Sequence, residues 1–284
     1  MNATPVTTAV TAADVTSAPG QGQAGLPGEV IMSARGLEMS FGQTHALRGV
    51  DLDLLAGEVL AVTGPSGSGK STLLHVMAGV LVPDAGSVSY HGGKSPGGGA
   101  TDVAEDIAVN IAVLDEAARS RLRLNEFGFI FQFGQLLPDL SALDNVTIPL
   151  LLAGTPRRKA LAQAHETLGE LGLSEHLDKR PTQLSGGQAQ RAAVARALVT
   201  NPRLLFADEP TGSLDSLAAE RTMEVLLNSV RSRGAGLVII THDARVAAYA
   251  DREVTVRDGR IGPGATHTVA GPSDPQHSTT GSRS

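Results

Sequence analysis

The sequence predicts an α/β fold, a mostly parallel sheet with helices on its faces, because strand and helix signals alternate along the chain. Three short apolar runs carry this prediction: 58–63 (EVLAVT), 204–207 (LLFA) and 237–241 (LVIIT). Their length and composition are typical of parallel strands that are buried on both faces.

The helices predicted beside these strands begin and end at recognisable residues. Residues 70–79 follow a Gly-rich turn, and residues 216–233 form a long helix that Gly234 ends. Residues 156–172 predict a further helix, and residues 253–261 (EVTVRDGRI) predict a hairpin with an Asp-Gly turn.

Composition indicates where the ordered domain begins and ends. Residues 1–28 and 262–284 contain few large apolar side chains, so they are predicted to be disordered tails. They leave an ordered domain at 29–261, in which the mostly helical stretch at about 138–183 is predicted to be a subdomain inserted in the sheet. The Gly-rich segment 91–100 predicts a surface loop, to which no function is assigned.

Charge and composition exclude several classes of protein. The formal net charge is −6 and aromatic residues make up 3% of the chain, which argues against a nucleic-acid partner. The chain has no Cys, so it forms neither a disulfide framework nor a thiolate metal site. No apolar run reaches the ~18 residues of a membrane-spanning helix, so any membrane role is expected to pass through a partner.

A Gly-rich segment after the first predicted strand has the pattern of a phosphate-binding loop. Residues 64–71 (GPSGSGKS) fit G-x-x-x-x-G-K-[ST] between a strand and a helix. The glycines are expected to let backbone N–H groups converge on phosphate oxygens, and the helix N-terminus favours the same anion. Lys70 is predicted to reach the β- and γ-phosphates, Ser71 to bind Mg²⁺ and Thr72 to add a hydroxyl group. The predicted nucleotide contacts here are Gly64, Pro65, Ser66, Gly67, Ser68, Gly69, Lys70, Ser71 and Thr72.

Two carboxylates follow the apolar run at 204–207. Asp208 and Glu209 are expected at the carboxyl end of a parallel strand, the edge at which open α/β sheets bind ligands. Asp208 suits a position near Mg²⁺, and Glu209 suits a general base that polarises an attacking water. The alternative is an Asp-Glu-Pro turn that ends the strand.

A second candidate anion site opens a helix at residues 184–188 (LSGGQ). Ser185 suits the N-cap position, and Gly186 and Gly187 leave backbone N–H groups uncovered. The residues of this segment alone are equally consistent with an ordinary helix that a Ser caps.

The LSGGQ segment matches the signature of ATP-binding cassette (ABC) ATPases, and further motifs of that family stand in the family's order. Gln132 resembles the Q-loop residue, residues 212–215 the D-loop, His242 the switch histidine and Phe41 the aromatic residue that stacks on adenine. Taken singly, three of these residues have ordinary alternatives: Gln132 as a surface Gln, His242 as a loop His and Phe41 as a core Phe. The likeness covers about residues 31–261.

The resemblance implies a P-loop NTPase (RecA-like) core with an antiparallel β subdomain and an inserted α-helical subdomain. It implies that two cassettes, most simply two copies of this chain, bind two ATP molecules between them head to tail. Asp215 would lie in the dimer seam. The implied catalytic residues are Glu209, His242 and Gln132; the implied Mg²⁺ ligands are Ser71, Gln132 and Asp208; the implied contacts to the opposite subunit's γ-phosphate are Ser185, Gly186, Gly187 and Gln188.

The chain most resembles the lipoprotein-releasing and macrolide-export group of cassettes, on residues 131–138 (FQFGQLLP), 140–149 and 208–215 (DEPTGSLD). Gly134 and Ala189 depart from the aromatic and polar residues usual in that group. The resemblance implies a cytoplasmic ATPase subunit on the inner face of the cell membrane, which powers an integral membrane permease for a hydrophobic or amphipathic substrate.

Two alternatives differ in what the ATPase drives. A cell-division-type cassette would transmit force or signal through a membrane partner without transport, with the same site residues. A soluble P-loop ATPase acting on DNA or ribosomes would need long coiled-coil heptads or a second cassette, and the sequence contains neither.

Overall fold

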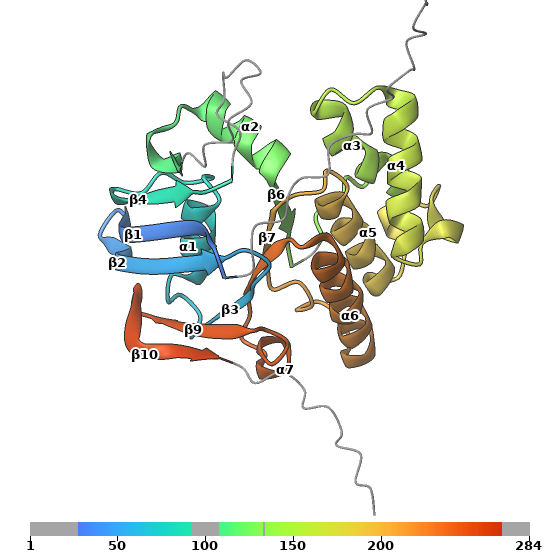
Figure 1. Cartoon of the computed structure of the whole chain (residues 1–284). Helices are drawn as coiled ribbons and strands as arrows, with labels where there is room; N and C mark the ends of the chain where they lie inside the picture. The colour runs from blue at the N-terminus through green and yellow to red at the C-terminus, as the bar shows by residue number, and fades with distance from the viewer. Residues whose placement is uncertain (1–27, 93–107, 133, 269–284) are drawn as a thin grey trace, which may run out of the picture.

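The computed structural model describes residues 28–92, 108–132 and 134–268, which form two sheets flanked by helices (Figure 1). Most of the two predicted tails and of the predicted loop at 91–100 lies outside these described residues.

The larger sheet contains the three strands that the apolar runs predict. Its order is β10-β9-β3-β8-β7-β6, and all neighbours are parallel except the antiparallel pair β9–β10. The predicted ends of β3, β7 and β8 are correct to within one residue. The strands are β3 (Val59–Thr63), β6 (Phe127–Ile130), β7 (Leu204–Asp208), β8 (Gly236–Ile240), β9 (Arg252–Arg257) and β10 (Arg260–Thr268).

Alternate residues of the central strands point to opposite faces of this sheet. Val62 of β3 lies in one apolar core with α1 (Lys70–Met77), whereas Ala61 lies in a second core with α5 (Gly186–Leu198). Burial on both faces explains why the strands are continuous apolar runs. Helices α1 and α5 therefore cover opposite faces of one sheet (Figure 1).

The smaller sheet is the antiparallel β subdomain that the resemblance implies. Its order is β2-β1-β4-β5, and its inward side chains share the apolar core of α1. The strands are β1 (Val30–Phe41), β2 (Thr44–Leu55), β4 (Ala85–Tyr90) and β5 (Val109–Asn110).

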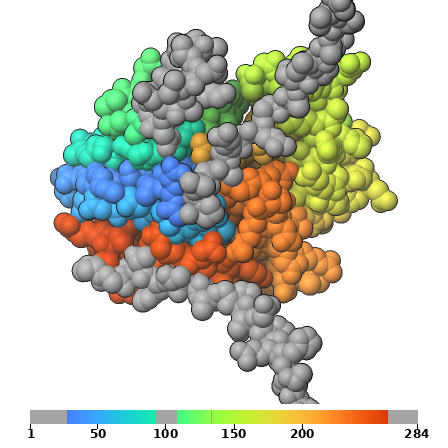
Figure 2. All heavy atoms as spheres, in the orientation of Figure 1, coloured from blue at the N-terminus to red at the C-terminus, as the bar shows by residue number. Residues whose placement is uncertain are grey.

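The inserted helical subdomain is also present. Its buried residues, among them Val146 and Leu168, belong to the apolar core of α5. Figure 2 shows it in yellow-green on the right of the molecule, above α6 (Ser216–Arg233). Within the described residues, no helix combines the length and apolar character needed to cross a membrane. The helices of this subdomain are α3 (Ala142–Leu152), α4 (Arg157–Glu170), η2 (Ser174–His176) and η3 (Pro181–Gln183).

The predicted start of the C-terminal tail at Gly262 is wrong. Strand β10 continues to Thr268, because residues 266–268 pair with residues 252–254 of β9. A register shift between Ile261 and Thr266 accommodates the Gly-Pro-Gly segment that suggested a tail. The composition of a segment does not show whether its backbone pairs with a neighbouring strand, as residues 266–268 do with β9.

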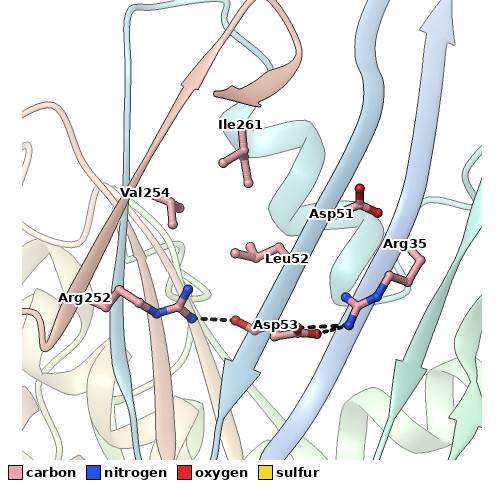
Figure 3. A pocket seen from close by; sticks show the side chains of 7 residues that line it. All are labelled: Arg35, Asp51, Leu52, Asp53, Arg252, Val254 and Ile261. Atoms are coloured by element: carbon pink, nitrogen blue, oxygen red, sulfur yellow. Dashed lines mark hydrogen bonds and ion pairs between the residues drawn. The ribbon is translucent and has the colours of Figure 1, made fainter. Parts of the chain in front are cut away.

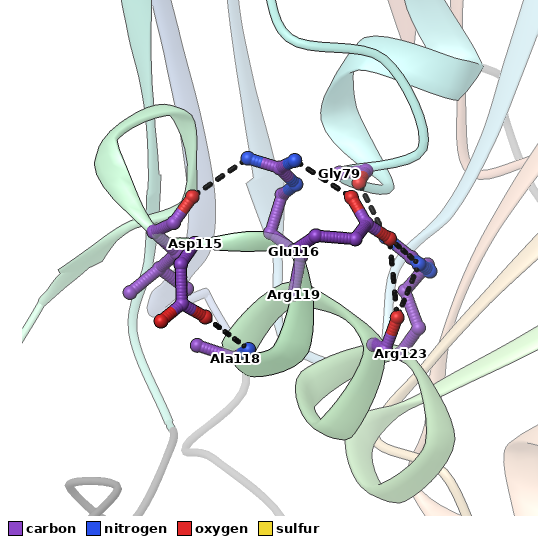
Figure 4. Close-up of polar contacts among 8 residues, drawn as sticks. Gly79, Asp115, Glu116, Ala118, Arg119 and Arg123 are labelled. Carbon is purple, nitrogen blue, oxygen red and sulfur yellow. Dashed lines mark hydrogen bonds and ion pairs between the residues drawn. The ribbon is translucent and has the colours of Figure 1, made fainter.

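Helix α2 (Glu116–Glu126) is tied to the end of α1 by an ion-pair cluster (Figure 4). The carboxylate of Glu116 accepts hydrogen bonds from Arg123 at 2.8 Å and Arg119 at 2.7 Å. These bonds, that of Arg123 foremost, lower the pKa of Glu116 to about 2. Arg123 also donates to the carbonyl oxygen of Gly79, just beyond α1. Two short helices complete the described elements: η1 (Ile111–Val113) and α7 (Ala244–Ala247).

A hollow between β2 and β9 lies outside the predicted site (Figure 3). Arg252 of β9 donates to the carbonyl oxygen of Asp53 and to the carboxylate of Glu58, and Arg35 pairs with the Asp53 carboxylate at 2.7 Å. The bond from Arg252 to Asp53 joins β9 of the larger sheet to β2 of the smaller one, whereas the pair of Arg35 and Asp53 links β1 to β2 within the smaller sheet. None of the residues that line the hollow belongs to the predicted site residues.

Candidate functional site

The phosphate loop and the predicted catalytic residues follow four neighbouring strands of the larger sheet. Strands β3, β8, β7 and β6 are parallel and adjacent, so their carboxyl ends lie along one edge of the sheet. Gly64 directly follows β3, and Asp208 is the last residue of β7. His242 lies two residues after the end of β8, and Gln132 lies two residues after the end of β6. The sheet therefore brings together residues that lie up to 178 positions apart, from Gly64 to His242.

The three glycines of the phosphate loop, residues 64–71, have different surroundings. All three have positive φ, at 138° for Gly64, 74° for Gly67 and 104° for Gly69. A Cβ at Gly64 would clash with the carbonyl oxygen of Val256, and one at Gly69 with that of Ala46. A Cβ at Gly67 would meet nothing within 4 Å. Two glycines thus allow close packing of the protein's own backbone, and only Gly67 faces open space.

The side chains of the loop are arranged around a buried cation. The ammonium group of Lys70 donates to the carbonyl oxygens of Gly64 at 2.9 Å and Pro65 at 2.8 Å. The hydroxyl oxygen of Ser68 is buried and has no hydrogen-bond partner among the described residues. Pro65, Ser66 and Ser71 are exposed, and Thr72 is half-buried. An ammonium group and an unpaired hydroxyl group in one loop suit an oxygen-rich anion.

A contact that sequence reasoning missed supports this loop from the C-terminal hairpin. Gly259, in the turn between β9 and β10, donates its N–H to the carbonyl oxygen of Ser68 at 2.9 Å. A Cβ at Gly259 would lie 2.7 Å from the carbonyl oxygen of Ala46, so the position needs glycine. The Asp-Gly turn itself was predicted, but nothing in the sequence links it to a loop almost 200 residues earlier.

Glu209 and His242 form a close pair at the sheet edge. Oε1 of Glu209 lies 2.6 Å from Nδ1 of His242. Glu209 has a φ of 48°, a left-handed conformation that costs a residue with a side chain about 1 kcal/mol. Its N–H donates to the carbonyl oxygen of Ile240 at 3.0 Å, which fixes the strained residue to β8. Strain held in place by neighbouring strands is common at functional sites.

The charge of Glu209 acts directly on His242. The hydrogen bond and the negative charge of Glu209 raise the pKa of His242 above its ordinary value. Lys70 acts in the opposite direction and lowers this pKa. The phosphate-loop lysine is therefore close enough to His242 for their charges to interact.

Gln132 lies beside the residues that follow Glu209. A Cβ at Gly212 would lie 3.0 Å from Nε2 of Gln132 and 3.5 Å from Cβ of Glu209. Ser213 donates its hydroxyl group to the carbonyl oxygen of Gln132 at 3.0 Å. The structure thus places Gln132, Glu209 and His242 in one neighbourhood.

The segment 184–188 shows the local structure of its alternative, the Ser-capped helix. Ser185 accepts the N–H of Gln188 at 3.3 Å, and Gln188 accepts the N–H of Ser185 at 2.9 Å, which is a capping box. Ser185 and Gly186 are exposed, and Gly187 is buried against Ala218. This cap leaves the exposed residues available to a ligand from outside the chain.

Two further predicted residues lie at the surface. Asp215 caps α6 by accepting the N–H of Ala218 at 2.9 Å, and it is exposed. Phe41 ends β1 with 52% of its surface exposed, so it does not belong to the core.

Known proteins similar to this chain indicate the family to which it belongs. A family model described as ABC transporter matches residues 47–212. The lipoprotein-releasing system ATP-binding protein LolD 2 of Caulobacter vibrioides is 45% identical over 236 residues, 81% of this chain and 96% of that protein. The chain belongs to the ABC transporter family. It is an ATP-binding ATPase subunit, with the P-loop NTPase fold that the resemblance implies.

Other members of the ABC transporter family are similar over the same length of chain. The macrolide export ATP-binding/permease protein MacB of Nitrosomonas europaea is 42% identical over 81% of this chain, which corresponds to 33% of that longer protein. A dimeric structure of the ATP-binding cassette MJ0796, in a post-hydrolysis state bound to ADP and Pi, is 31% identical with a TM-score of 0.72. That match covers 84% of this chain and 99% of the other.

Proposed function

We propose that the chain is the ATP-hydrolysing subunit of a lipoprotein-releasing or macrolide-export type of transporter, and powers a separate integral membrane permease. The permease would export or extract a hydrophobic or amphipathic substrate and would hold the chain at the cytoplasmic face of the membrane. The observation that carries the proposal is that the phosphate loop with Lys70 and the Glu209–His242 pair meet at one sheet edge. The names of the relatives favour transport over the cell-division alternative.

The triphosphate of ATP is the group that the loop is built to hold. The backbone N–H groups of residues 64–69 and the ammonium group of Lys70 would bind the β- and γ-phosphates, and Thr72 would contact the α-phosphate. Lys70 now donates to two carbonyl oxygens of its own loop, and it would exchange these bonds for stronger bonds to charged oxygens. Phe41 would stack on the adenine, which suits an exposed aromatic ring.

Hydrolysis needs a base and a group that holds the γ-phosphate. Glu209 would accept a proton from the attacking water, whose oxygen forms a bond to the γ-phosphorus while the bond to the bridging oxygen of ADP breaks. His242 would hold the γ-phosphate and the water in line. The contact at 2.6 Å shows that the two side chains reach each other, so His242 can also orient the carboxylate of Glu209.

The magnesium ion is proposed to bind between the loop and the sheet edge. Ser71, Gln132 and Asp208 supply a hydroxyl, an amide and a carboxylate oxygen, which suit the preference of Mg²⁺ for oxygen ligands. Bound there, the ion would supply positive charge to the phosphate oxygens.

A second copy of the chain is proposed to complete each site. Ser185, Gly186, Gly187 and Gln188 would contact the γ-phosphate that the opposite subunit holds, and Asp215 would lie in the seam. The exposure of Ser185, Gly186 and Asp215 supports this arrangement. So does the position of α5 on the sheet face opposite α1.

The test of the phosphate loop is ATP binding by a lysine variant. Lys70→Ala is expected to lose most nucleotide affinity, because it removes the cation from the loop. The matched control is Lys159→Ala, an exposed lysine of α4 outside the site. Titration with a fluorescent ATP analogue measures both. Equal ATP affinity of Lys70→Ala and the wild type would reject the phosphate-loop proposal.

A further inference from the structure

Helix α5 holds the loop around Gln132 by a side chain far from the signature residues at its start. Arg196 donates from Nη2 to the carbonyl oxygen of Gly134 and from Nη1 to that of Gln135, both at 2.8 Å. The two bonds use separate nitrogens of one planar guanidinium group, so Arg196 holds two successive peptide units at once.

The backbone of this loop depends on such support. Gly134 and Gln135 are consecutive left-handed residues, with φ of 65° and 45°. Gln135 carries a side chain, which makes this conformation unfavourable by itself. Within the loop, Gly134 donates its N–H to the carbonyl oxygen of Phe131 at 2.9 Å. The charged guanidinium group of Arg196 donates hydrogen bonds to the carbonyl oxygens of this strained turn and so holds its conformation.

Further contacts reach the same loop. Gln190, also in α5, donates to the carbonyl oxygen of Phe131 at 3.2 Å. Gly134 is buried against this helix, because a Cβ there would lie 3.3 Å from Cβ of Ala193. Together with the bond from Ser213 to the carbonyl oxygen of Gln132, the carbonyl groups of all four described residues at 131–135 accept bonds from side chains. Three of these four bonds come from α5.

Partial burial of the charged side chain of Arg196 costs free energy. The side chain is half-buried, and loss of water around it lowers its pKa below the ordinary value. A desolvated cation needs its acceptors, and the two carbonyl oxygens need a donor. Removing the guanidinium group would leave both peptide units of the turn without this bond.

We propose that Arg196 is a positioning residue, which fixes the direction of Gln132 and makes the Gln132 loop move together with α5, the helix that Ser185 caps. The catalytic meaning of this link rests on the proposed function, in which Gln132 contacts Mg²⁺ and water while Ser185 contacts the opposite nucleotide. A shift of α5 on dimer closure is then transmitted to Gln132 through Arg196 within the same chain.

The test compares Arg196→Ala with Arg196→Lys and a matched control. The control is Arg203→Ala, because Arg203 also donates to a backbone carbonyl, that of Gly92 at 2.8 Å, outside the site. The first readout is amide hydrogen exchange of Gln132, Gly134 and Gln135. Arg196→Ala is expected to speed this exchange at least tenfold and Arg203→Ala to leave it unchanged. Unchanged exchange in folded Arg196→Ala would overturn the proposal.

The second readout is ATP hydrolysis. Arg196→Ala is expected to lower kcat by about 10-fold to 100-fold with little change in KM, since small misplacement of a reacting group has effects of this size. Arg196→Lys is expected to recover part of this loss, because an ammonium group can still reach one carbonyl. Faster exchange with an unchanged kcat would also overturn the positioning role.

A double-mutant cycle with Gln132→Ala separates this proposal from the proposed function. If Arg196 acts through Gln132, Arg196→Ala lowers kcat much less in the Gln132→Ala background than in the wild type. Equal losses in both backgrounds would mean that Arg196 acts elsewhere and would overturn the link. If Gln132→Ala alone leaves kcat unchanged, the catalytic part of the proposed function fails, whereas the exchange result still decides whether Arg196 holds the loop.

Discussion

The contact between Glu209 and His242 shows how single residues acquire their properties from the sheet edge. Neither side chain is unusual in sequence, and 72% of the His242 side chain is exposed. The strained turn at Glu209 and its bond to Ile240 bring the carboxylate to the imidazole. The pair is therefore a product of two parallel strands that end side by side.

A titration of His242 tests this contact. Because Glu209 stabilises the charged imidazolium, the wild-type midpoint is expected above the ordinary value of 6.5. Any stability from the pair is present below that ordinary value and is lost as pH rises through the raised pKa. Glu209→Gln is expected to lower the midpoint. Proton NMR of the imidazole measures it, and a midpoint that does not move in the variant would contradict the contact.

At the scale of elements, the hairpin of β9 and β10 contacts the phosphate loop although it lies far from that loop in sequence. Its turn donates from Gly259 to Ser68, and Arg48 donates its N–H to the carbonyl oxygen of Gly259 at 2.8 Å. The turn thus joins the loop to β2.

Gly259→Ala is expected to weaken ATP binding. The new Cβ would meet Ala46 and push the turn off Ser68, a loss of about 1 kcal/mol or roughly fivefold in affinity. The control is Gly154→Ala, at φ of 83° with no atom within 4 Å of the new Cβ. Both variants bear the strain of positive φ, but only Gly259→Ala should lose affinity in an ATP titration. Equal affinities would contradict the support by the hairpin.

The elements that could be predicted are those whose signals are local. Helix α6 has its predicted bounds because Asp215 caps its start and Gly234, at φ of 64°, ends it. Strands β3, β7 and β8 are apolar runs because both faces are buried. The smaller sheet followed only from the resemblance to a family.

The remaining features come from contacts between distant residues. The end of β10 depends on pairing with β9, and the bonds of Arg196 join positions 61 and 62 residues apart. Contacts with distant residues also explain two glycines of the phosphate loop, and the sequence does not show these contacts. The sequence predicts glycines for the ligand, whereas Gly64 and Gly69 are required by Val256 and Ala46.

At the scale of the whole molecule, the larger sheet separates the two features to which the proposed function assigns anion binding. The phosphate loop begins α1 on one face, and Ser185 caps α5 on the other (Figure 1). Since both helices are packed into apolar cores, neither can leave its face without unfolding. A second copy is the simplest source of a signature segment for the nucleotide, and closure would then follow from γ-phosphate contacts.

The most direct measurement of this two-copy site is the mass of Glu209→Gln by light scattering, with and without ATP. The variant keeps Lys70 and the loop, so it should bind ATP, fail to release phosphate and accumulate as a dimer of twice the 29.2 kDa chain mass. Without nucleotide it should stay monomeric. A variant that binds ATP at saturation and remains a monomer would contradict the central claim that two chains close around the same nucleotide.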